Sequence, residues 1–124
     1  MMIQNEIKSP YAAVRPMHPL QNRWTGGLWK ERFDTCKNVT IPHIRGLFED
    51  ENVFHVVENF RIAAGQKEGR FKGTPFGDGD FYKWMEGAIQ TAVLTEDQEL
   101  LEDIDRYIEL IGEAQLPDGY ISTK

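Results

Sequence analysis

The stretch "FYKWMEGAIQTAVLTEDQELLEDIDRYIELI", residues 81–111, gives the clearest indication of the fold. Apolar residues in its second half recur one and three positions apart, which is the pattern of one face of an amphipathic α-helix: Leu100, Leu101, Ile104, Tyr107, Ile108 and Ile111. The first half spreads its apolar residues over a wider arc, as is typical of a helix contacted on more than one side. The stretch therefore predicts two antiparallel helices joined by a short loop.

Polar residues indicate where these two helices begin and end. We expect Asp80 to be the N-cap of a helix over residues 81–93, because aspartate often accepts the free amide hydrogens of a first turn. The sequence "TEDQ", residues 95–98, matches a capping box in which Thr95 is the N-cap of the second helix. The turn sequence "PDG", residues 117–119, follows this helix and ends it.

Shorter apolar patterns upstream predict further helical segments. Residues 53–64, "VFHVVENFRIAA", carry one apolar stripe and are followed by Gly65, a typical helix stop. A helix also follows the glycine pair at residues 26 and 27, with one apolar face formed by Trp29, Phe33 and Cys36. Pro42 is expected to interrupt that helix, so that a second short helical piece starts near it and ends around Asp50.

Two regions lack helical periodicity. Residues 65–79 contain five glycines, and each glycine inside a helix costs about 1 kcal/mol relative to alanine, so we predict a loop there. Residues 1–23 contain three of the six prolines. We interpret them as an extended arm that lies over the rest of the chain and could include one short strand.

Together these segments predict an all-α fold built from antiparallel helix hairpins. Repeated hairpins of this kind stack into toroids and solenoids. The two and a half hairpins of this chain make an arc and cannot close a ring, which indicates that the chain is an incomplete ring.

Length and charge limit the classes of function. A chain of 124 residues is one domain or part of one. Its net charge of −6 argues against general nucleic-acid binding, which depends on lysine and arginine side chains that neutralise phosphates. No apolar run reaches the length needed to cross a membrane. Cys36 is the single cysteine, and the first residues lack a signal-peptide pattern, so the expected location is the cytoplasm.

Five stretches together resemble the N-terminal part of glycoside hydrolase family 127, the β-L-arabinofuranosidase-like proteins. They read "LWKERF", "TIP", "ENFRIAAGQKEGRFKGTPFGDGDFYKWMEGA", "IELIGEAQ" and "PDGYISTK". The resemblance covers residues 24–124, which we therefore expect to form the N-terminal part of an (α/α)6-barrel glycosidase-like domain, preceded by the arm of residues 1–23. Gly79 and the last three residues depart from the usual family pattern.

The resemblance implies an (α/α)6 barrel and a retaining mechanism. In that mechanism a zinc-bound cysteine thiolate is the nucleophile and a glutamate is the general acid/base. Those residues lie downstream in the family, and Cys36 does not match the family nucleophile. The resemblance therefore assigns no catalytic residue and no metal ligand to this chain, and zinc is implied only for a downstream part.

Aspartates at the start of the 81–93 helix are candidate substrate-binding residues. Helix N-termini of the inner ring face the active side in barrels of this kind, so Asp78 and Asp80 could accept hydrogen bonds from sugar hydroxyls. The alternative is structural, with Asp80 as the N-cap and Asp78 stabilising the turn. Lys83 and Glu86 lie three positions apart on the same helix and could form an ion pair.

Aromatic residues near these aspartates are further candidates. Tyr82 and Trp84 could offer a flat face to a sugar, or could belong to the core. Asp118 and Tyr120 could reach the rim of the pocket, or could form a tight turn with Tyr120 packed inward. The three histidines, His18, His43 and His55, lack the spacing of a metal site, and Cys36 is expected to be a small buried apolar residue.

Two hypotheses about function follow. In the first, the chain is the N-terminal segment of a glycoside hydrolase that acts on carbohydrate of the arabinofuranoside type, and it contributes barrel wall and pocket rim without catalysing the reaction alone. In the second, it is a stand-alone small helical protein without catalysis that binds carbohydrate or self-associates to cover an exposed apolar surface. Neither hypothesis involves nucleic acid or a membrane.

Overall fold

The computed structural model describes residues 10, 11, 13, 14 and 19–124. The elements are a 3₁₀-helix η1, a π-helical turn η2 and five α-helices: η1 Pro19–Gln21, α1 Gly27–Thr35, η2 Cys36–Thr40, α2 Ile41–Glu49, α3 Val56–Ala63, α4 Gly77–Thr95 and α5 Gln98–Glu113. The described residues contain no strand, which confirms the all-α prediction. Most of the predicted arm, including residues 1–9 and 15–18, lies outside the described residues.

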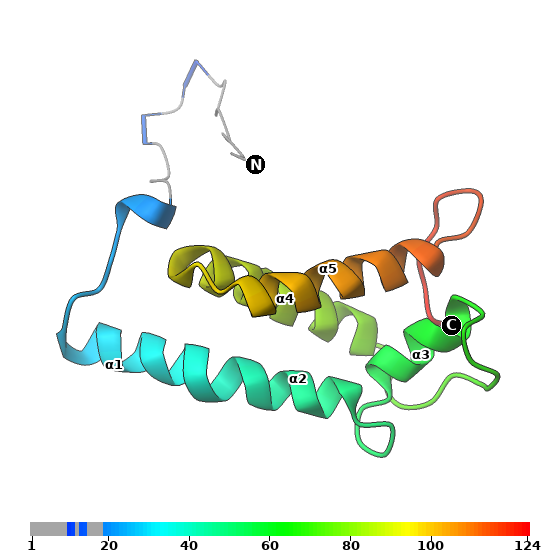
Figure 1. Cartoon of the computed structure of the whole chain (residues 1–124). Coiled ribbons are helices and arrows are strands. Elements are labelled where there is room, and N and C mark those ends of the chain that lie inside the picture. Colours follow the sequence, from blue (N-terminus) through cyan, green and yellow to red (C-terminus); the bar gives the residue numbers. More distant parts are fainter. Residues whose placement is uncertain (1–9, 12, 15–18) are drawn as a thin grey trace.

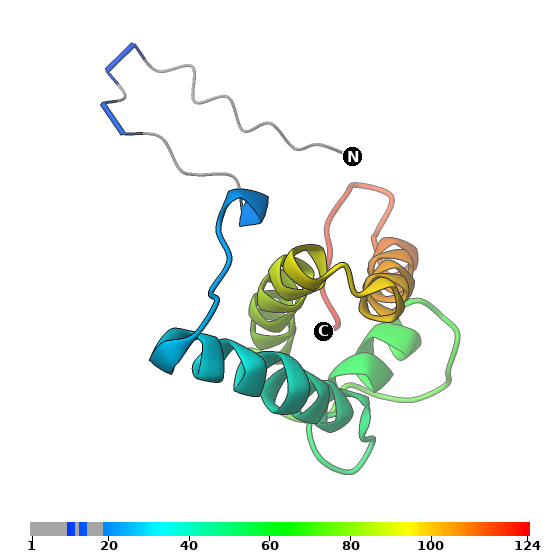
Figure 2. The ribbon, with the colours of Figure 1, turned by 60° about the vertical axis from the view of Figure 1, so that its left-hand side comes forward.

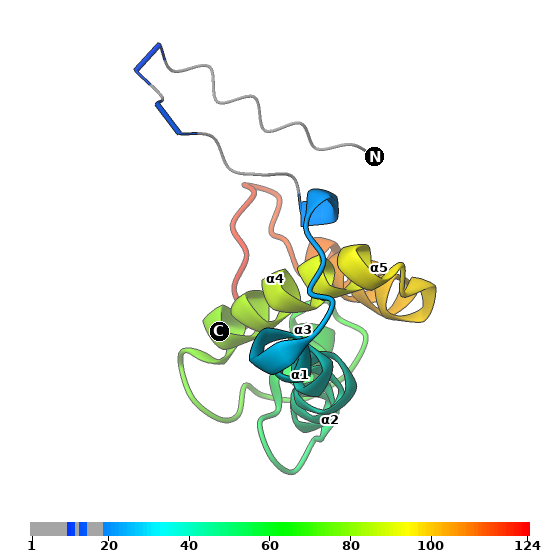
Figure 3. The same ribbon diagram turned by 90° about the vertical axis from the view of Figure 1, so that its left-hand side faces the viewer.

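The helices form two layers. In Figure 1, α1 and α2 follow one another as a single row beneath the hairpin of α4 and α5, and α3 lies at one end of this row. Figure 2 shows α4 and α5 side by side above the row. Figure 3 looks along α1 and α2 and again places the hairpin on one side of them. No described helix is long and apolar enough to cross a membrane.

Aromatic rings from four helices form the centre of the core. The ring of Phe81 in α4 lies against four others, stacking on Trp84 with centroids 5.7 Å apart. It meets the other three at centroid distances of 5.2–5.9 Å, one each from α2, α3 and α5: Phe48, Phe60 and Tyr107. Phe60 and Phe81 are fully buried. The predicted apolar stripes of α3, α4 and α5 thus meet at one residue.

Polar contacts add to this core between α2 and α5. Asp103 is only 8% exposed and pairs with Arg45 of α2 and with Arg106 of α5. The hydroxyl of Tyr107 donates a hydrogen bond to Glu49 at the end of α2. Burial and the Glu49 carboxylate both raise the pKa of Tyr107, so this hydroxyl remains a donor. The polar side of α5 is therefore partly an internal contact surface.

Pro42 does not break the helix that precedes it, contrary to the prediction. The chain stays helical from α1 to α2 because the turn before Pro42 widens into the π-helical η2, where the amide of Ile41 donates to the carbonyl of Cys36. Proline lacks an amide hydrogen and its ring would clash with a regular preceding turn, so the wider turn accommodates it. The predicted start near Pro42 and end near Asp50 are confirmed by α2. The predicted apolar face is only partly correct, because Trp29 is 69% exposed.

The predicted beginnings of α4 and α5 were both misplaced. Helix α4 begins at Gly77, so Asp80 lies inside the first turn and is not the N-cap. A side chain at Gly77 would place its Cβ 3.2 Å from a methyl of Val56, and the glycine thus permits close packing of α4 on α3. Helix α4 also extends to Thr95, and Asp97 is the N-cap of α5, accepting from the amide of Leu100 at 3.1 Å.

The predicted stop of α3 is confirmed. Gly65 has a φ of 75°, which glycine adopts without strain. Its amide donates to the carbonyl of Ile62, and the amide of Gln66 donates to that of Arg61, which is the pattern of a Schellman motif. The chain therefore leaves α3 in a defined direction into the glycine-rich segment.

The identity of the α5 cap can be tested by substitution. Asp97→Ala should lower the free energy of unfolding by about 1 kcal/mol, because the amide of Leu100 loses its acceptor. Asp97→Asn should retain most of the stability, since asparagine caps as well as aspartate. Urea denaturation followed by circular dichroism measures all variants. An unchanged free energy of unfolding in Asp97→Ala would contradict the assignment of Asp97 as the cap.

Candidate functional site

The candidate site lies where α4 begins and the C-terminal segment returns to it. The carboxylate of Asp78 accepts two hydrogen bonds from Thr123, one from its amide at 3.1 Å and one from its hydroxyl at 2.7 Å. Thr123 is only 7% exposed. Asp78 therefore joins two segments that are 45 positions apart in the sequence, and its predicted structural role extends well beyond a local turn.

Tyr82 lies one turn after Asp78 on α4. Its side chain is 40% exposed, and its ring lies 6.1 Å from the ring of Phe60. Burial and the nearby Asp78 carboxylate raise the pKa of Tyr82, which keeps its hydroxyl protonated as a donor. Asp80 is bound by Lys83 at 3.0 Å, so the predicted Lys83–Glu86 pair is replaced by this one.

Trp84 belongs to the core. It is 8% exposed, and its indole nitrogen donates to the carbonyl of Ile41 at 3.2 Å. The rings of Phe48, Phe81 and Tyr107 lie around it. Of the two roles considered for Trp84, the structure shows the packing role, because these rings leave no open face for a sugar.

Asp118 and Tyr120 lie on the tight turn after α5. The carboxylate of Asp118 accepts from the amide of Tyr120 at 3.0 Å, and the amide of Gly119 donates to the carbonyl of Leu116 at 2.8 Å. The turn is thus confirmed, but Tyr120 is 63% exposed and does not pack inward. Tyr120 and Thr123 share the lining of a hollow of about 220 Å³ beside α3, whereas Asp118 does not line it.

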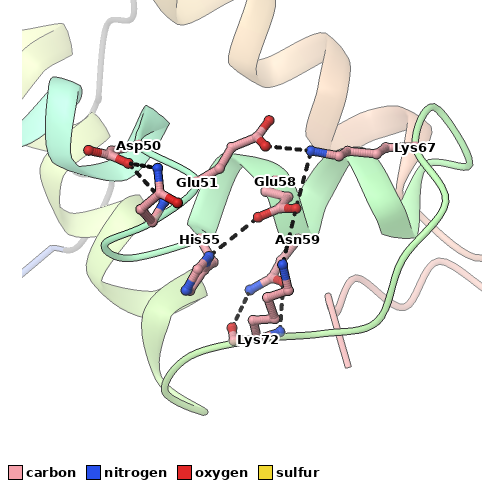
Figure 4. Close-up of polar contacts among 8 residues, drawn as sticks. Asp50, Glu51, His55, Glu58, Asn59, Lys67 and Lys72 are labelled. Atoms are coloured by element: carbon pink, nitrogen blue, oxygen red, sulfur yellow. Dashed lines mark hydrogen bonds and ion pairs between the residues drawn. The ribbon is translucent and has the colours of Figure 1, made fainter.

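A buried polar cluster at the start of α3 was not predicted from the sequence (Figure 4). Glu58 is only 5% exposed and lies 3.2 Å from Lys67 and 3.7 Å from Lys72. Its other oxygen lies 3.3 Å from Nδ1 of His55. Lys67 also binds Glu51 at 2.6 Å. Two loop lysines thus neutralise one buried helical carboxylate.

Asn59 fixes the same loop through its amide group. Its nitrogen donates to the carbonyl of Lys72 at 2.8 Å, and its oxygen accepts from the amide of Lys72 at 3.0 Å. Glu58 and Asn59 together attach residues 66–76 to α3. The sequence signal was the presence of two adjacent polar residues inside an otherwise apolar stripe, with lysines in the following loop.

Electrostatic contacts stabilise the charged form of Glu58. The hydrogen bond from Lys67 lowers the pKa of Glu58 most, and His55 and Lys72 lower it further, although burial acts in the opposite direction. The loop that these contacts hold leads directly into the first turn of α4. Glu58 therefore contributes to the placement of Asp78 and Tyr82 without belonging to the exposed site.

The described residues do not fit a zinc–thiolate centre. They contain no group of three or more histidine, cysteine, aspartate or glutamate side chains that could hold a metal ion. Cys36 is partly buried and packs against the core. We derive no metal-dependent step from these residues.

Comparisons with known proteins place this geometry in a family. A family model described as "Beta-L-arabinofuranosidase, GH127 catalytic domain" matches residues 21–124. The chain is 34% identical over 115 residues to a non-reducing end beta-L-arabinofuranosidase from Bifidobacterium longum subsp. longum. The aligned part covers 80% of this chain and 18% of that relative.

A solved structure shows the same likeness. The crystal structure of a GH127 beta-L-arabinofuranosidase from Geobacillus stearothermophilus T6 matches with a TM-score of 0.78 and 37% identity, covering 82% of this chain and 16% of that one. The match confirms the expected fold, an all-α set of helix hairpins that forms part of an (α/α)6 barrel. The chain spans less than one fifth of the length of either relative.

The role of Glu58 predicts a specific pH dependence. Its pKa is lower in the folded chain than the ordinary 4.5, so its contribution to stability is complete above that value and is lost as the pH falls through the folded pKa. Glu58→Gln should therefore lower the urea midpoint at pH 7, and its difference from the unmodified chain should shrink between pH 5 and pH 3.

Glu68→Gln is the matched control, because Glu68 is an exposed acid in the same loop. Its urea midpoint should follow that of the unmodified chain at every pH. A difference for Glu58→Gln that stays constant as the pH falls would show that the charge of Glu58 does not hold the loop.

Proposed function

Because this chain belongs to the GH127 β-L-arabinofuranosidase family, we propose that it forms the N-terminal helices of a retaining glycoside hydrolase that cleaves β-L-arabinofuranosides. The observation that carries the proposal is the family match over residues 21–124, which includes the whole α4–α5 hairpin and the Asp78–Thr123 contact. In this role the chain supplies barrel wall and one part of the pocket rim.

Asp78 and Tyr82 are the residues that we propose for the rim. Each carboxylate oxygen of Asp78 accepts one hydrogen bond from Thr123, and an ionised carboxylate offers about four acceptor positions in total. Asp78 can therefore accept from a sugar hydroxyl while it holds the C-terminal segment. Tyr82 adds a partly exposed ring and a protonated hydroxyl next to it.

Tyr120, Asp118 and Asp80 have smaller proposed roles. Tyr120 is exposed on the turn that follows α5, and Figure 1 shows the segment after α5 at the end of the hairpin where α4 begins. Its ring could contact a sugar there. Asp80 and Asp118 are already engaged, by Lys83 and by the turn backbone respectively. They are therefore second choices for direct contact.

Chemistry requires groups that we assign outside residues 1–124. A retaining glycosidase needs a nucleophile and a general acid/base on opposite sides of the scissile bond. We propose that the zinc, the thiolate nucleophile and the catalytic glutamate implied by the family belong to a part of the enzyme outside residues 1–124, and that residues 1–124 alone are inactive. The cytoplasmic location stays a prediction based on the sequence.

A chimera tests the proposal directly. Residues 21–124 replace the matching segment of the Bifidobacterium longum relative, and hydrolysis of an aryl β-L-arabinofuranoside is measured. We expect the chimera to hydrolyse this substrate, and Asp78→Asn in it to lower kcat/KM about tenfold or more, since a hydrogen bond to a charged group contributes about 1.5–3 kcal/mol.

Asp50→Asn is the matched control for this experiment, because Asp50 is an exposed aspartate after α2 whose carboxylate binds only the neighbouring turn. It should leave kcat/KM within about twofold, a difference of about 0.4 kcal/mol. A folded chimera without activity would refute the family role of this segment. Hydrolysis by the isolated chain would refute the assignment of the chemistry elsewhere.

An exposed apolar face supports self-association as a second candidate function for the isolated chain. Three residues on one side of α4 remain 36–40% exposed: Tyr82, Ile89 and Val93. They repeat at helical spacing and so form one stripe. Exposed apolar residues that share one face mark interaction sites in soluble proteins, and this stripe is interrupted by a single charged residue, Glu86.

Sedimentation at increasing concentration tests self-association. We expect dimers of the 124-residue chain, and we expect Ile89→Glu to shift them to monomers because a charge would enter the contact. Glu86→Gln, on the same side of the helix, should not weaken the dimer. A chain that remains monomeric at millimolar concentration would exclude this second function.

A further inference from the structure

A second hollow, of about 260 Å³, lies at the end of α4 opposite to Asp78. Its lining comes from the segment before α1, from α1 and η2, and from the last turn of α4, and it includes Arg23, Trp24, Phe33, Lys37, Leu94 and Thr95. Leu94 lies 16 positions after Asp78, which corresponds to about 24 Å along a helix. In Figure 1 the α4–α5 turn is likewise at the far side from the C-terminus. This hollow is therefore separate from the candidate site.

One wall of the hollow is aromatic. The rings of Trp24 and Phe33 lie 5.1 Å apart at an angle of 35°, and Trp24 is still 45% exposed. Leu94 is half-buried beside them. A flat apolar wall with a few polar groups around it is the usual composition of a small-molecule site.

Three cations and one carboxylate line this hollow: Arg23, Lys30, Lys37 and Asp34. Lys30 holds both oxygens of Asp34 at 2.5–2.6 Å, so this pair is internally satisfied. Arg23 lies 3.9 Å from Glu96, and Lys37 lies 4.0 Å from Asp97. Both distances exceed that of a hydrogen bond, and such loose surface pairs contribute little free energy. Arg23 and Lys37 can therefore donate to a ligand.

The hollow is sized for one ring. Sites for drug-sized ligands occupy about 300–1,000 Å³, and this volume lies just below that range. The acids Asp34, Glu96 and Asp97 each lie beside one cation of this region and would repel a polyanion, whereas a single carboxylate can be bound by Arg23 and Lys37, which line the same hollow. The chemistry thus favours a small, singly charged ligand with one apolar face.

We propose that this hollow binds one carboxylate-bearing sugar ring, a uronic acid residue, with its ring against Trp24 and its carboxylate between Arg23 and Lys37. The sugar part of this inference rests on the proposed function of this chain, and the anionic part rests on Arg23 and Lys37 in the lining of the hollow. The site would engage an acidic residue of a glycan at a distance from the rim at Asp78.

Nitrogen-labelled chain and NMR provide the test, because the chain has only three tryptophans and each gives one indole signal. Sodium D-glucuronate should shift the Trp24 indole signal in a saturable way at constant ionic strength, and neutral D-glucose should not. Lys37→Gln should weaken the binding about tenfold. The indole signal that is missing from the spectrum of Trp24→Phe is the signal of Trp24, which assigns it. Lys83→Gln, at the other end of α4, is the matched control and should bind as the unmodified chain does.

Several outcomes would overturn the proposal. Equal shifts with glucose would show that the hollow does not recognise the carboxylate. Shifts with sodium benzoate but not with glucuronate would show that the ligand is not a sugar. A glucuronate response that moves the Trp29 signal and leaves Trp24 unchanged would place the binding elsewhere. The chimera experiment is independent, since an active chimera without glucuronate binding refutes only this inference, and glucuronate binding with an inactive chimera refutes only the proposed function.

Discussion

The structure depends on one constraint, the burial of the Phe81 ring between rings from three other helices. Because this ring meets Phe48, Phe60 and Tyr107 at once, α2, α3 and α5 are each fixed against α4. Edge-to-face and offset contacts of this kind add to the hydrophobic free energy of burial. The position of α4 then decides where its N-terminal residues, and with them the candidate rim, are presented.

Polar contacts hold the two segments that do not pack into the aromatic core, one between α3 and α4 and the other after α5. The segment between α3 and α4 contains three glycines, Gly65, Gly69 and Gly73, and few apolar side chains, so hydrophobic burial alone would not order it. Glu58 and Asn59 compensate by binding side chains and backbone of that segment from inside α3. Thr123 provides a similar attachment for the C-terminal segment through Asp78. The rim is thus held by a few specific hydrogen bonds on an apolar scaffold.

The sequence predicted the helices well because periodicity reports which face of a helix is buried, and most residues of the predicted α3 and α5 stripes are buried or half-buried. Among the exceptions are Val53, which precedes α3 and is 47% exposed, and Ile108 of α5, which is 51% exposed. It failed where local chemistry was ambiguous. Aspartate and threonine both cap helices, and only the path of the chain shows that Asp97 is the cap and that Asp80 lies inside α4. Glu58 was overlooked because its partners, Lys67 and Lys72, become neighbours only when the loop folds back.

The widened turn between α1 and α2 has a consequence for how this helix row can evolve. A π-helical turn holds one residue more than an α-helical turn, and one residue corresponds to a rotation of about 100° around the axis. The two helices of the row therefore present their apolar faces in directions that are set separately on either side of η2. Helix α2 faces the core through Ile41 and Phe48, and α1 turns Phe33 toward Trp24. Loss of a single residue within η2 would convert it to a regular α-helical turn and rotate α1 about the axis relative to α2. Insertions and deletions at η2 could therefore change which face α1 presents while α2 keeps the same face on the core.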